Sequence, residues 1–255
     1  MSSNRIEAVI VCKDYGDFLA HTLPENLNHF DHIVVVTHHS DKLTKSICAK
    51  YSVECVEAHV FDEDGARFNK GRAVNVGQSH LKKPDFIVHM DADIVMPSRF
   101  RNMIEKTKLN ESYIYGCDRV NVYGWEKWLE VKEQTTPHYK DFWFVKPPSD
   151  LQICSRIIHR EHGYVPIGFF QMWHKSQNKK YPIYEGTAEH SDVLFAIQWH
   201  RTQRILLPEV FVYHLESGKH KMGENWYGRK SKNFCPCHKA PQKNNEYQLK
   251  GESTK

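Results

Sequence analysis

The sequence, 255 residues long, has no long hydrophobic run. None of its apolar stretches approaches the roughly 20 residues that a helix needs to cross a bilayer, so we expect no integral membrane segment. The first five residues lead directly into a short strand-like run, so we also expect no secretory signal. These absences argue against the membrane-spanning and secreted classes and predict a cytoplasmic protein.

The cysteines are too scattered for a disulfide framework. Seven are present, an odd number, which favours reduced thiols in a cytoplasm. One short stretch, Cys235-Pro-Cys237-His238, does gather soft metal ligands. A structural zinc site normally draws on a second matching pair, which the sequence lacks, so zinc binding is left open here.

Positive charge is concentrated near the end of the chain. The formal net charge is +4, but residues 218–255 alone carry nine Lys or Arg and three Glu, an excess of +6. The preceding residues therefore sum to −2. A basic stretch of this kind suits contact with an anion, such as a diphosphate, a nucleic acid or an acidic surface. A solvated, mobile tail is the alternative interpretation.

What the chain does contain is an alternation of short apolar runs and helical patterns. Its 40% hydrophobic and 12% aromatic content is typical of a globular α/β domain of this length. Such an alternation indicates a mostly parallel central sheet, flanked by helices, that binds its ligand beyond the carboxyl ends of the strands. Pro24 is expected near a turn or at the start of its helix. The first half predicts strands at 8–12, 32–37, 53–60 and 86–90, and helices at 18–30, 41–50 and 70–81.

The second half is less regular. Residues 121–150 are rich in Trp, Tyr and Pro without a clean period, and they predict a long functional loop or an insertion rather than core. The other expected elements are a helix at 97–108, a strand at 113–117, an aromatic strand-like segment at 163–173, a helix at 192–199 and a pair of short strands at 205–214.

Two acids, Asp91 and Asp93, directly follow the strand predicted at 86–90. Side chains two residues apart on an extended chain point the same way, so both carboxylates can face one site. Neighbouring carboxylates repel each other unless a cation or a proton lies between them. Oxygen ligands of this kind suit Mg²⁺ or Mn²⁺, particularly when the ion also holds a substrate's phosphates. An ordinary strand end with two solvated acids is the alternative.

Three further segments accompany this pair of acids. A helix that starts near Phe68-Asn-Lys-Gly-Arg72 lies upstream, Glu189-His-Ser-Asp192 opens a helix downstream, and His214 ends a strand. In this order the segments resemble the GT-A glycosyltransferases, most closely the β-1,4-galactosyltransferase and polypeptide N-acetylgalactosaminyltransferase branches and the broad family 2 enzymes. The resemblance covers roughly residues 6–216. It implies a single GT-A (Rossmann-like) domain at 1–217, followed by a basic lid and tail at 218–255.

The resemblance also implies a metal site and a donor site. Asp93 and His214 would ligate the metal, Mn²⁺ or Mg²⁺, and Asp91 would contact either the metal or the nucleotide ribose. An imidazole ligand favours Mn²⁺. The residues that would bind the nucleotide sugar are Asp14, Asp41, Lys70, Arg72 and Asp91. Two of these have simpler interpretations, since Asp41 also suits a helix N-cap and Lys70 and Arg72 suit a helix surface.

The catalytic base is expected in the downstream acidic motif. Inverting relatives carry two adjacent acids there, and the second deprotonates the acceptor hydroxyl. In this chain His190 follows Glu189, and the next acid is Asp192. The base is therefore Asp192 or Glu189, with His190 as a substitute, and the stereochemical outcome stays open.

Aromatic residues are expected around the acceptor. The resemblance places Gly168, Phe169 and Trp173 at the floor of the sugar and acceptor site, and Trp226 in the lid. Their rings would stack on sugars or bases, although core packing explains aromatic residues equally well. The same two interpretations apply to Trp125, Trp128 and Trp143.

The sequence thus predicts a metal-dependent glycosyltransferase that moves a sugar from a nucleotide-sugar donor, a UDP-sugar, to an acceptor hydroxyl. A glycan precursor is the default acceptor, and hydroxymethylated bases of phage DNA are the alternative that the basic tail permits. Two other classes remain. A nucleotidyltransferase would normally show a Gly-rich loop after the first strand, which Lys13-Asp-Tyr-Gly16 is not, and a nucleotide- or nucleic-acid-binding module would need no metal.

Overall fold

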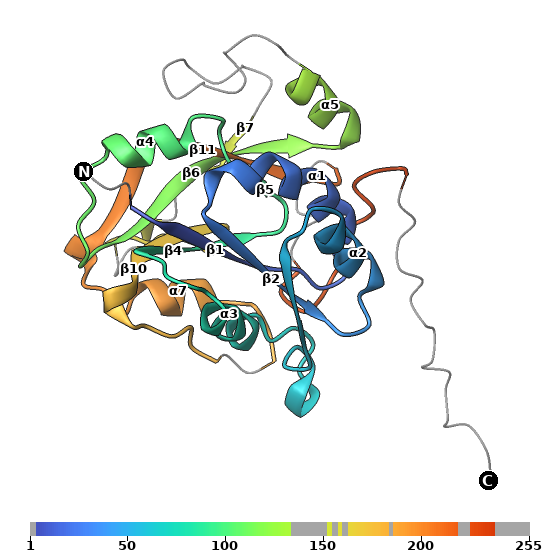
Figure 1. Cartoon of the computed structure of the whole chain (residues 1–255), viewed down its shortest axis with the longest axis horizontal. Helices are drawn as coiled ribbons and strands as arrows, with labels where there is room; N and C mark the ends of the chain where they lie inside the picture. The colour runs from blue at the N-terminus through green and yellow to red at the C-terminus, as the bar shows by residue number, and fades with distance from the viewer. Residues whose placement is uncertain are drawn as a thin grey trace.

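The structure is a computed structural model that describes residues 4–133, 152–154, 158–159, 163–183, 186–218 and 225–237. Its centre is a large curled sheet with helices on both faces, so the predicted α/β fold is confirmed (Figure 1). In the described part of the chain, no helix is long and apolar enough to cross a membrane.

The first half of the chain builds the parallel part of the sheet. Strands β1, β2, β3 and β4 pair in parallel in the order β3-β2-β1-β4. The elements are β1 (Ile6–Val11), α1 (Gly16–Asn26), β2 (His32–His38), α2 (Lys42–Lys50), β3 (Glu54–Ala58), α3 (Lys70–Ser79) and β4 (Phe86–Asp91), with 3₁₀ turns η1 (Leu27–His29) and η2 (Glu63–Gly65). Pro24 lies inside α1, and the helix ends two residues later. The expected position near a turn is confirmed, because the 3₁₀ turn η1 begins at Leu27, whereas Pro24 does not start the helix.

The second half of the sheet is mixed. Strand β10 runs antiparallel between β4 and β6, and β11 then continues parallel to β6. Because β10 is antiparallel to both β4 and β6, β6 runs in the same direction as β4. Strands β6 and β11 therefore end at the same edge of the sheet as β1 and β4. The elements are β5 (Ile94–Val95), α4 (Phe100–Lys106), β6 (Ile114–Tyr123), α5 (Trp125–Glu133), β7 (Gln152–Cys154), β8 (Ile158–His159), β9 (Gly163–Tyr164), β10 (Phe170–His174), η4 (Lys175–Gln177), α7 (Ser191–Ala196), η5 (Arg201–Gln203) and β11 (Arg204–Glu216).

Two expectations for the second half are wrong. Residues 121–133 are not a loop, because β6 extends to Tyr123 and α5 follows, whereas 134–150 lie outside the described residues. The two short strands expected at 205–214 are one long strand, β11, whose register with β6 shifts between Leu207 and Phe211. Pro208 lies in that interval and has no N–H to donate to the ladder, which accounts for the interruption that the sequence suggests.

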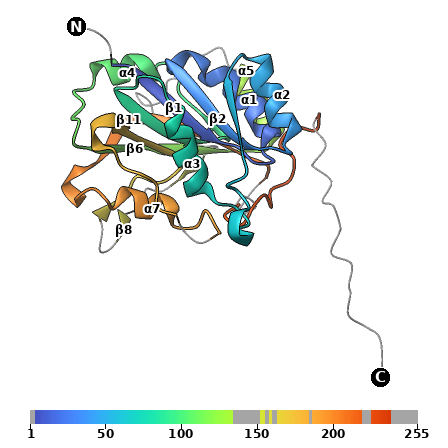
Figure 2. The same cartoon turned by 60° about the horizontal axis from the view of Figure 1, so that its bottom comes forward.

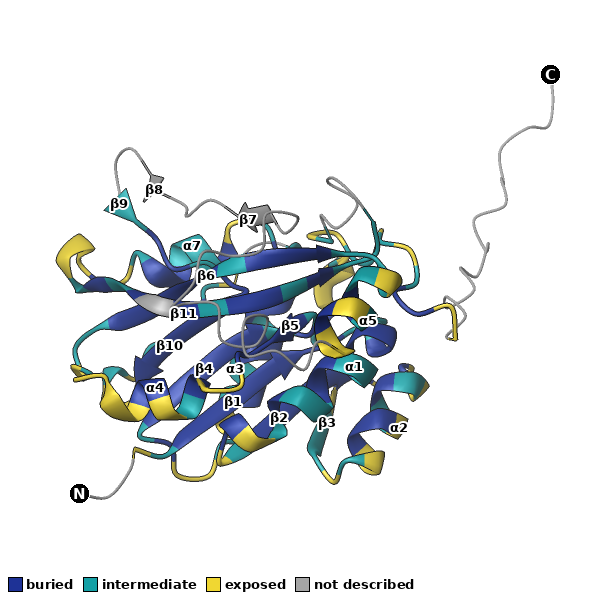
Figure 3. Ribbon diagram, turned by 90° about the horizontal axis from the view of Figure 1, so that it is seen from above, coloured by how far each residue is buried: buried dark blue, intermediate teal, exposed yellow. Residues whose placement is uncertain are grey.

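The alternation of side chains along β1 divides the core into two layers. Ile6, Ala8 and Ile10 pack on one face with α1, α2 and α4, whereas Val9 and Val11 pack on the other face with α3 and α7. Figure 2 shows α3 across the face of β1 and β2, and Figure 3 shows the central strands buried along their length. A Cβ at Gly77 would overlap Val9, so this glycine lets α3 pack closely on the sheet. The loops beyond the strand ends are thereby held on a rigid support.

Candidate active site

The carboxyl edge of the sheet brings together acids from segments far apart in the sequence. Asp14 follows β1 and Asp41 follows β2, while Asp91 ends β4 opposite Val11 of β1. His214 lies near the end of β11, where it pairs with Ile94 beside the Asp-Ala-Asp turn. The sheet topology therefore carries most of the predicted site residues to one edge.

Asp93 and His214 form a buried pair. His214 Nε2 lies 3.4 Å from Asp93 Oδ2, and each side chain is 14% exposed. Burial alone would lower the pKa of His214, but the neighbouring carboxylates of Asp93 and then Glu216 together offset it and raise that pKa to about 9. Burial in turn would raise the pKa of Asp93, and His214 lowers it below the usual range. The pair is thus an imidazolium–carboxylate contact when no metal is bound.

The donor set around this pair suits a divalent cation. Asp93 Oδ1 is buried and has no hydrogen-bond partner among the described residues. His214 Nδ1 lies 3.2 Å from both Asn121 Oδ1 and Glu216 Oε1, so its proton is held on that side of the ring. The opposite nitrogen, Nε2, is then left to face Asp93, as in a metal-ligating histidine oriented by outer partners. An orphaned carboxylate oxygen and an oriented imidazole fit Mn²⁺ or Mg²⁺.

Asp91 is engaged differently from Asp93. Lys70 Nζ, at the start of α3, donates to Asp91 Oδ1 at 2.6 Å, and Lys70 is almost fully buried. Burial would lower the pKa of Lys70, but Asp91 and then Asp192 raise it, so the amine stays protonated. The structure therefore separates the two acids of the motif, with one facing a histidine and the other a lysine.

Asp192 lies beside this lysine, on the other side of Gly168. Gly168 N donates to Asp192 Oδ2 at 2.6 Å, and Val193 N donates to Oδ1 at 2.9 Å. A Cβ at Gly168 would lie 2.9 Å from Lys70 Nζ and 3.0 Å from Asp192 Oδ2. Both the Lys70 amine and the Asp192 carboxylate therefore border the space that the glycine leaves, and among the three predicted bases Asp192 lies with the acid cluster.

Glu189 and His190, the other two predicted bases, contact each other and the C-terminal part of the chain. Glu189 Oε2 accepts a hydrogen bond from Tyr227 at 2.8 Å, and its Oε1 lies 3.3 Å from His190 Nε2. The His190 side chain is 59% exposed. Glu189 and His190 therefore border the C-terminal part of the chain, on the outer side of the site.

Asp41 and Asp14 are tied to the fold of the edge. Asp41 is buried and caps α2 by accepting from Thr44 N at 3.0 Å, and its Oδ2 accepts from Thr44 Oγ1, Thr37 Oγ1 and Asp14 N. Asp14 has a left-handed backbone, with φ of 57°. Burial and then Asp41 raise the pKa of Asp14. The N-cap interpretation of Asp41 is confirmed, and its carboxylate has little capacity left for a ribose.

Arg72 and Trp173 lie away from the acid cluster. Arg72 pairs with Glu63 at 2.6 Å and Asp64 at 3.0 Å on the surface of η2. Trp173 is fully buried and packs edge-on against Phe195 of α7, so its ring is not available to a sugar.

The other predicted aromatic residues are divided between core and surface. Phe169 is buried under the Arg119 guanidinium, at 4.9 Å from its ring centre, and Trp128 is also buried. Trp226 is 43% exposed. Trp143 lies outside the described residues.

Sequence reasoning missed Asn121, Glu216 and Arg119. Arg119 and Asn121 are two residues apart on β6, and Glu216 follows His214 by two residues on β11. Strand periodicity therefore places the members of each pair on one face of the sheet. This signal becomes usable only once the two strands are known to be neighbours.

Residues 225–237, here called the C-terminal segment, lie along the same edge. Ala188 N donates to Trp226 O at 2.8 Å, before α7, and Arg229 donates to Asp14 O at 2.7 Å, after β1. Arg229 also forms a buried ion pair with Asp17 of α1. The segment thus connects the two sides of the site. The lid and tail predicted at 218–255 include this segment, and the rest of that range, 219–224 and 238–255, lies outside the described part.

The segment also corrects the expectation about cysteines. Cys235 and Cys237 form a disulfide, whereas Cys12, Cys48, Cys55 and Cys117 are free. Reduced thiols are therefore wrong for this pair, and the spacing of two residues gave no indication of it.

Comparison with known proteins shows which family and which solved structures the chain resembles. A family model described as glycosyl transferase family 2 matches residues 7–163, more than half of the chain. A search of curated proteins finds no match. A solved mannosyltransferase, PcManGT from Pyrobaculum calidifontis, in complex with GDP-Man and Mn²⁺, is 14% identical over 84% of this chain and 57% of its own, with a TM-score of 0.51. GalNAc-T7 with UDP, GalNAc and Mn²⁺ is 11% identical over 86% of this chain and 45% of its own, with a TM-score of 0.52. The chain spans about half the length of these structures, and the likeness shows a shared fold.

Proposed function

The chain belongs to glycosyl transferase family 2, and on that premise we propose that it transfers a sugar from a nucleotide-sugar donor, a UDP-sugar, to an acceptor hydroxyl with the help of Mn²⁺. Family membership and the shared fold support glycosyl transfer as the reaction. The fold is that of the GT-A enzymes, which the sequence motifs resemble. Both structural neighbours were solved with Mn²⁺ and a nucleotide or nucleotide sugar. Mg²⁺ is the alternative ion.

One observation carries the proposal: the buried Asp93 Oδ1 has no partner among the described residues and belongs to the same carboxylate that faces His214 Nε2. Asp93 and His214 would hold the ion. Bound there, the ion would supply positive charge that stabilises the departing nucleotide diphosphate. Asn121 and Glu216 hold the imidazole from behind, which keeps its ligating nitrogen directed at the site.

Lys70 and Asp192 would serve the reacting groups. Lys70 is a buried, protonated cation at the centre of three acids, and its charge would attract the diphosphate of the donor. Asp192 would accept the proton of the acceptor hydroxyl as general base. Its backbone hydrogen bonds from Gly168 and Val193 fix the carboxylate in position. Asp91, held by Lys70, would then face the ribose.

The identity of the acceptor is a separate part of the proposal. A glycan precursor is the default, and hydroxymethylated DNA is the alternative that the basic residues of 218–255 permit. We also propose that the chain divides into a catalytic domain at 1–217 and a lid and tail at 218–255. The contacts of Arg229 and Trp226 across the site edge favour a covering role for the C-terminal segment.

The test is a panel of nucleotide sugars incubated with Mn²⁺, with release of the nucleotide diphosphate measured in the presence and absence of acceptors. We expect release from one donor, abolished by chelation and by Asp93→Asn. The matched control is Glu105→Gln, which changes an exposed carboxylate on α4 and should retain release. No release from any donor, or release that Asp93→Asn leaves unchanged, would contradict the proposal. A parallel screen of glycan acceptors and hydroxymethylated DNA identifies the acceptor.

A further inference from the structure

The C-terminal segment is fastened to α1 at three successive points. Arg229 pairs with Asp17, and Asp17 Oδ2 also accepts from Phe234 N at 2.7 Å. The Phe234 ring stacks on Phe18, with centroids 4.8 Å apart. The third point is His21, one helical turn beyond Asp17, where the two cysteines of the segment arrive. The first two points are an ion pair and an aromatic stack, whereas the third consists of soft metal ligands.

The third point brings one imidazole and two sulfur atoms together. One ligand atom from each of His21, Cys235 and Cys237 lies within 4.8 Å of the others, and among the described residues this is the one such group of three. The His21 ring is itself positioned by Trp125, at 4.5 Å between centroids. Cys235 is 1% exposed. The ligands therefore come from a helix and from the segment packed on it.

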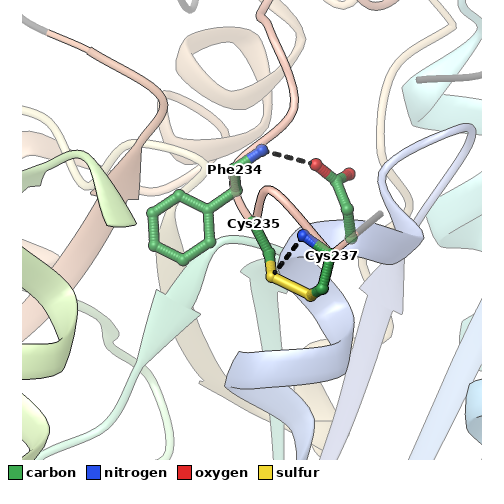
Figure 4. Close-up of a disulfide and its surroundings, with 4 residues drawn as sticks. Phe234, Cys235 and Cys237 are labelled. Carbon is green, nitrogen blue, oxygen red and sulfur yellow. Dashed lines mark hydrogen bonds between the residues drawn. A yellow bond between two sulfur atoms is a disulfide. The ribbon is translucent and has the colours of Figure 1, made fainter. Parts of the chain in front are cut away.

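A backbone N–H supports one of the sulfur atoms. Cys237 N donates to Cys235 Sγ at 3.2 Å, as Figure 4 shows together with the disulfide. A donor aimed at sulfur stabilises a thiolate, because it favours the charged form. Thiolates are the form in which cysteine binds metals, and neutral disulfide sulfur is not.

From these contacts we propose that His21, Cys235 and Cys237 form a Zn²⁺ site when the two cysteines are reduced, and that the disulfide is the metal-free state of the same site. A tetrahedral ion with Zn–S distances of about 2.3 Å holds its sulfur ligands about 3.7 Å apart. The three ligand atoms already lie within 4.8 Å of one another, a range that includes this sulfur–sulfur separation. Once the S–S bond is broken, the ligands need only local side-chain adjustment, and water completes the fourth position.

The exchange between the two states balances with a dithiol reductant. The reductant loses two electrons and two protons and becomes a disulfide, while the Cys235–Cys237 bond breaks and takes them up as two thiols. On binding Zn²⁺ the thiols release two protons, and His21 binds as the neutral imidazole. Two thiolates and one imidazole give a neutral centre, which suits a partly buried position beside Phe234 and Trp125.

This site differs in kind from the one at Asp93 and His214. Sulfur ligands select Zn²⁺ over Mn²⁺, whereas a carboxylate and an imidazole accept Mn²⁺. Both states of the cysteine pair join the segment to itself, but only the metal joins it to α1 through His21. Zinc would therefore fasten the end of the C-terminal segment, and oxidation would leave the Asp17 and Phe18 contacts alone to hold it.

The experiment uses Co²⁺ as a spectroscopic substitute for Zn²⁺ on the full chain. The protein is stripped with chelator and compared before and after treatment with a dithiol under anaerobic conditions. We expect thiolate-to-cobalt charge-transfer absorption, saturating at one ion per chain, in the reduced protein alone. Asp93 and His214 cannot produce this absorption because they contain no sulfur. Loss of this absorption on addition of Zn²⁺, which replaces Co²⁺ at the sulfur ligands, completes the assignment.

Two variants and one control test the ligands. His21→Ala and Cys237→Ser should each raise the Kd for Co²⁺ about a hundredfold or more, since even outer partners of a metal are worth ten- to a hundredfold. Cys55→Ser removes a cysteine of β3 outside the group and should leave the Kd within about twofold. Absence of the sulfur absorption in the reduced wild type, its persistence at full strength in His21→Ala, or its loss in Cys55→Ser would each overturn the proposal. Because the first comparison needs no substitution, a misfolded variant cannot hide a negative result.

Discussion

The raised pKa of His214 predicts a steep pH dependence of Mn²⁺ binding. Without metal the imidazole is protonated beside Asp93, with a pKa of about 9. A metal ligand must give up that proton, so each pH unit below 9 weakens binding about tenfold. The apparent Kd for Mn²⁺ should therefore be about a hundredfold higher at pH 7 than at pH 9, a difference of about 2.7 kcal/mol. Above pH 9 the dependence should level off.

The raised pKa of His214 also determines how the stability of the metal-free protein changes with pH. Because the folded pKa lies above the ordinary 6.5, the imidazolium–carboxylate pair stabilises the fold fully below pH 6.5, by about 3 kcal/mol. This contribution is lost as pH rises from 6.5 through 9. Chelated protein should thus unfold more easily at pH 9 than at pH 6.5, and Mn²⁺ should reverse the trend.

Electron paramagnetic resonance of free Mn²⁺ measures the Kd, and urea unfolding of the chelated protein measures stability. The control is His214→Gln, which keeps hydrogen-bonding capacity without a titratable ring and should bind weakly with no slope in this range. A Kd that is constant between pH 7 and pH 9 in the wild type, or a slope that survives in His214→Gln, would refute the assignment of His214 as a ligand.

Three further predictions concern single side chains. Lys70→Ala removes the buried partner of the Asp91 carboxylate, which is itself about one-third exposed, and should cost about 1–3 kcal/mol in urea unfolding, whereas Arg72→Ala breaks more exposed pairs and should cost less than about 1 kcal/mol; equal costs would contradict the burial argument. Asp192→Asn should lower kcat of sugar transfer by about 10²–10⁴ and Glu189→Gln by far less, and near-normal turnover in Asp192→Asn would remove it as the base. Burial lowers the pKa of His29 to about 4, so stability should fall by up to about 3 kcal/mol between pH 6.5 and 4, and His29→Gln should flatten that limb of the stability curve.

Local pattern was enough to predict the acids of the site. The strand pattern places Asp91 at the carboxyl end of β4 with Asp93 in the turn that follows, and an N-cap signal places Asp41, because both depend on a few neighbouring residues; the expectation that the two acids point the same way from an extended strand is wrong, since the turn directs them to different partners. Helix geometry also separates Lys70 from Arg72, since residues two apart on a helix do not share a face. The two cations accordingly have different partners, Asp91 for Lys70 and the acids of η2 for Arg72.

Strand order was beyond the reach of local pattern. Asn121 of β6 reaches His214 because β11 pairs in parallel with β6, an arrangement fixed by long-range pairing. Trp173 could not be assigned for a related reason. Both faces of β10 are covered, so alternation along that strand does not distinguish a core ring from an exposed one.

The pairing of Arg229 with Asp17 has a consequence for the order of folding. Asp17 is 2% exposed and is separated from Arg229 by 212 residues, so nearly the whole chain must be synthesised before this carboxylate receives its counter-ion. Domains fold progressively from the N-terminus during synthesis, and contacts of such long sequence separation form late. We expect α1 to dock on the sheet with an uncompensated charge until the C-terminal segment arrives. Completion of the covered edge would then be the last step in the maturation of the newly made protein.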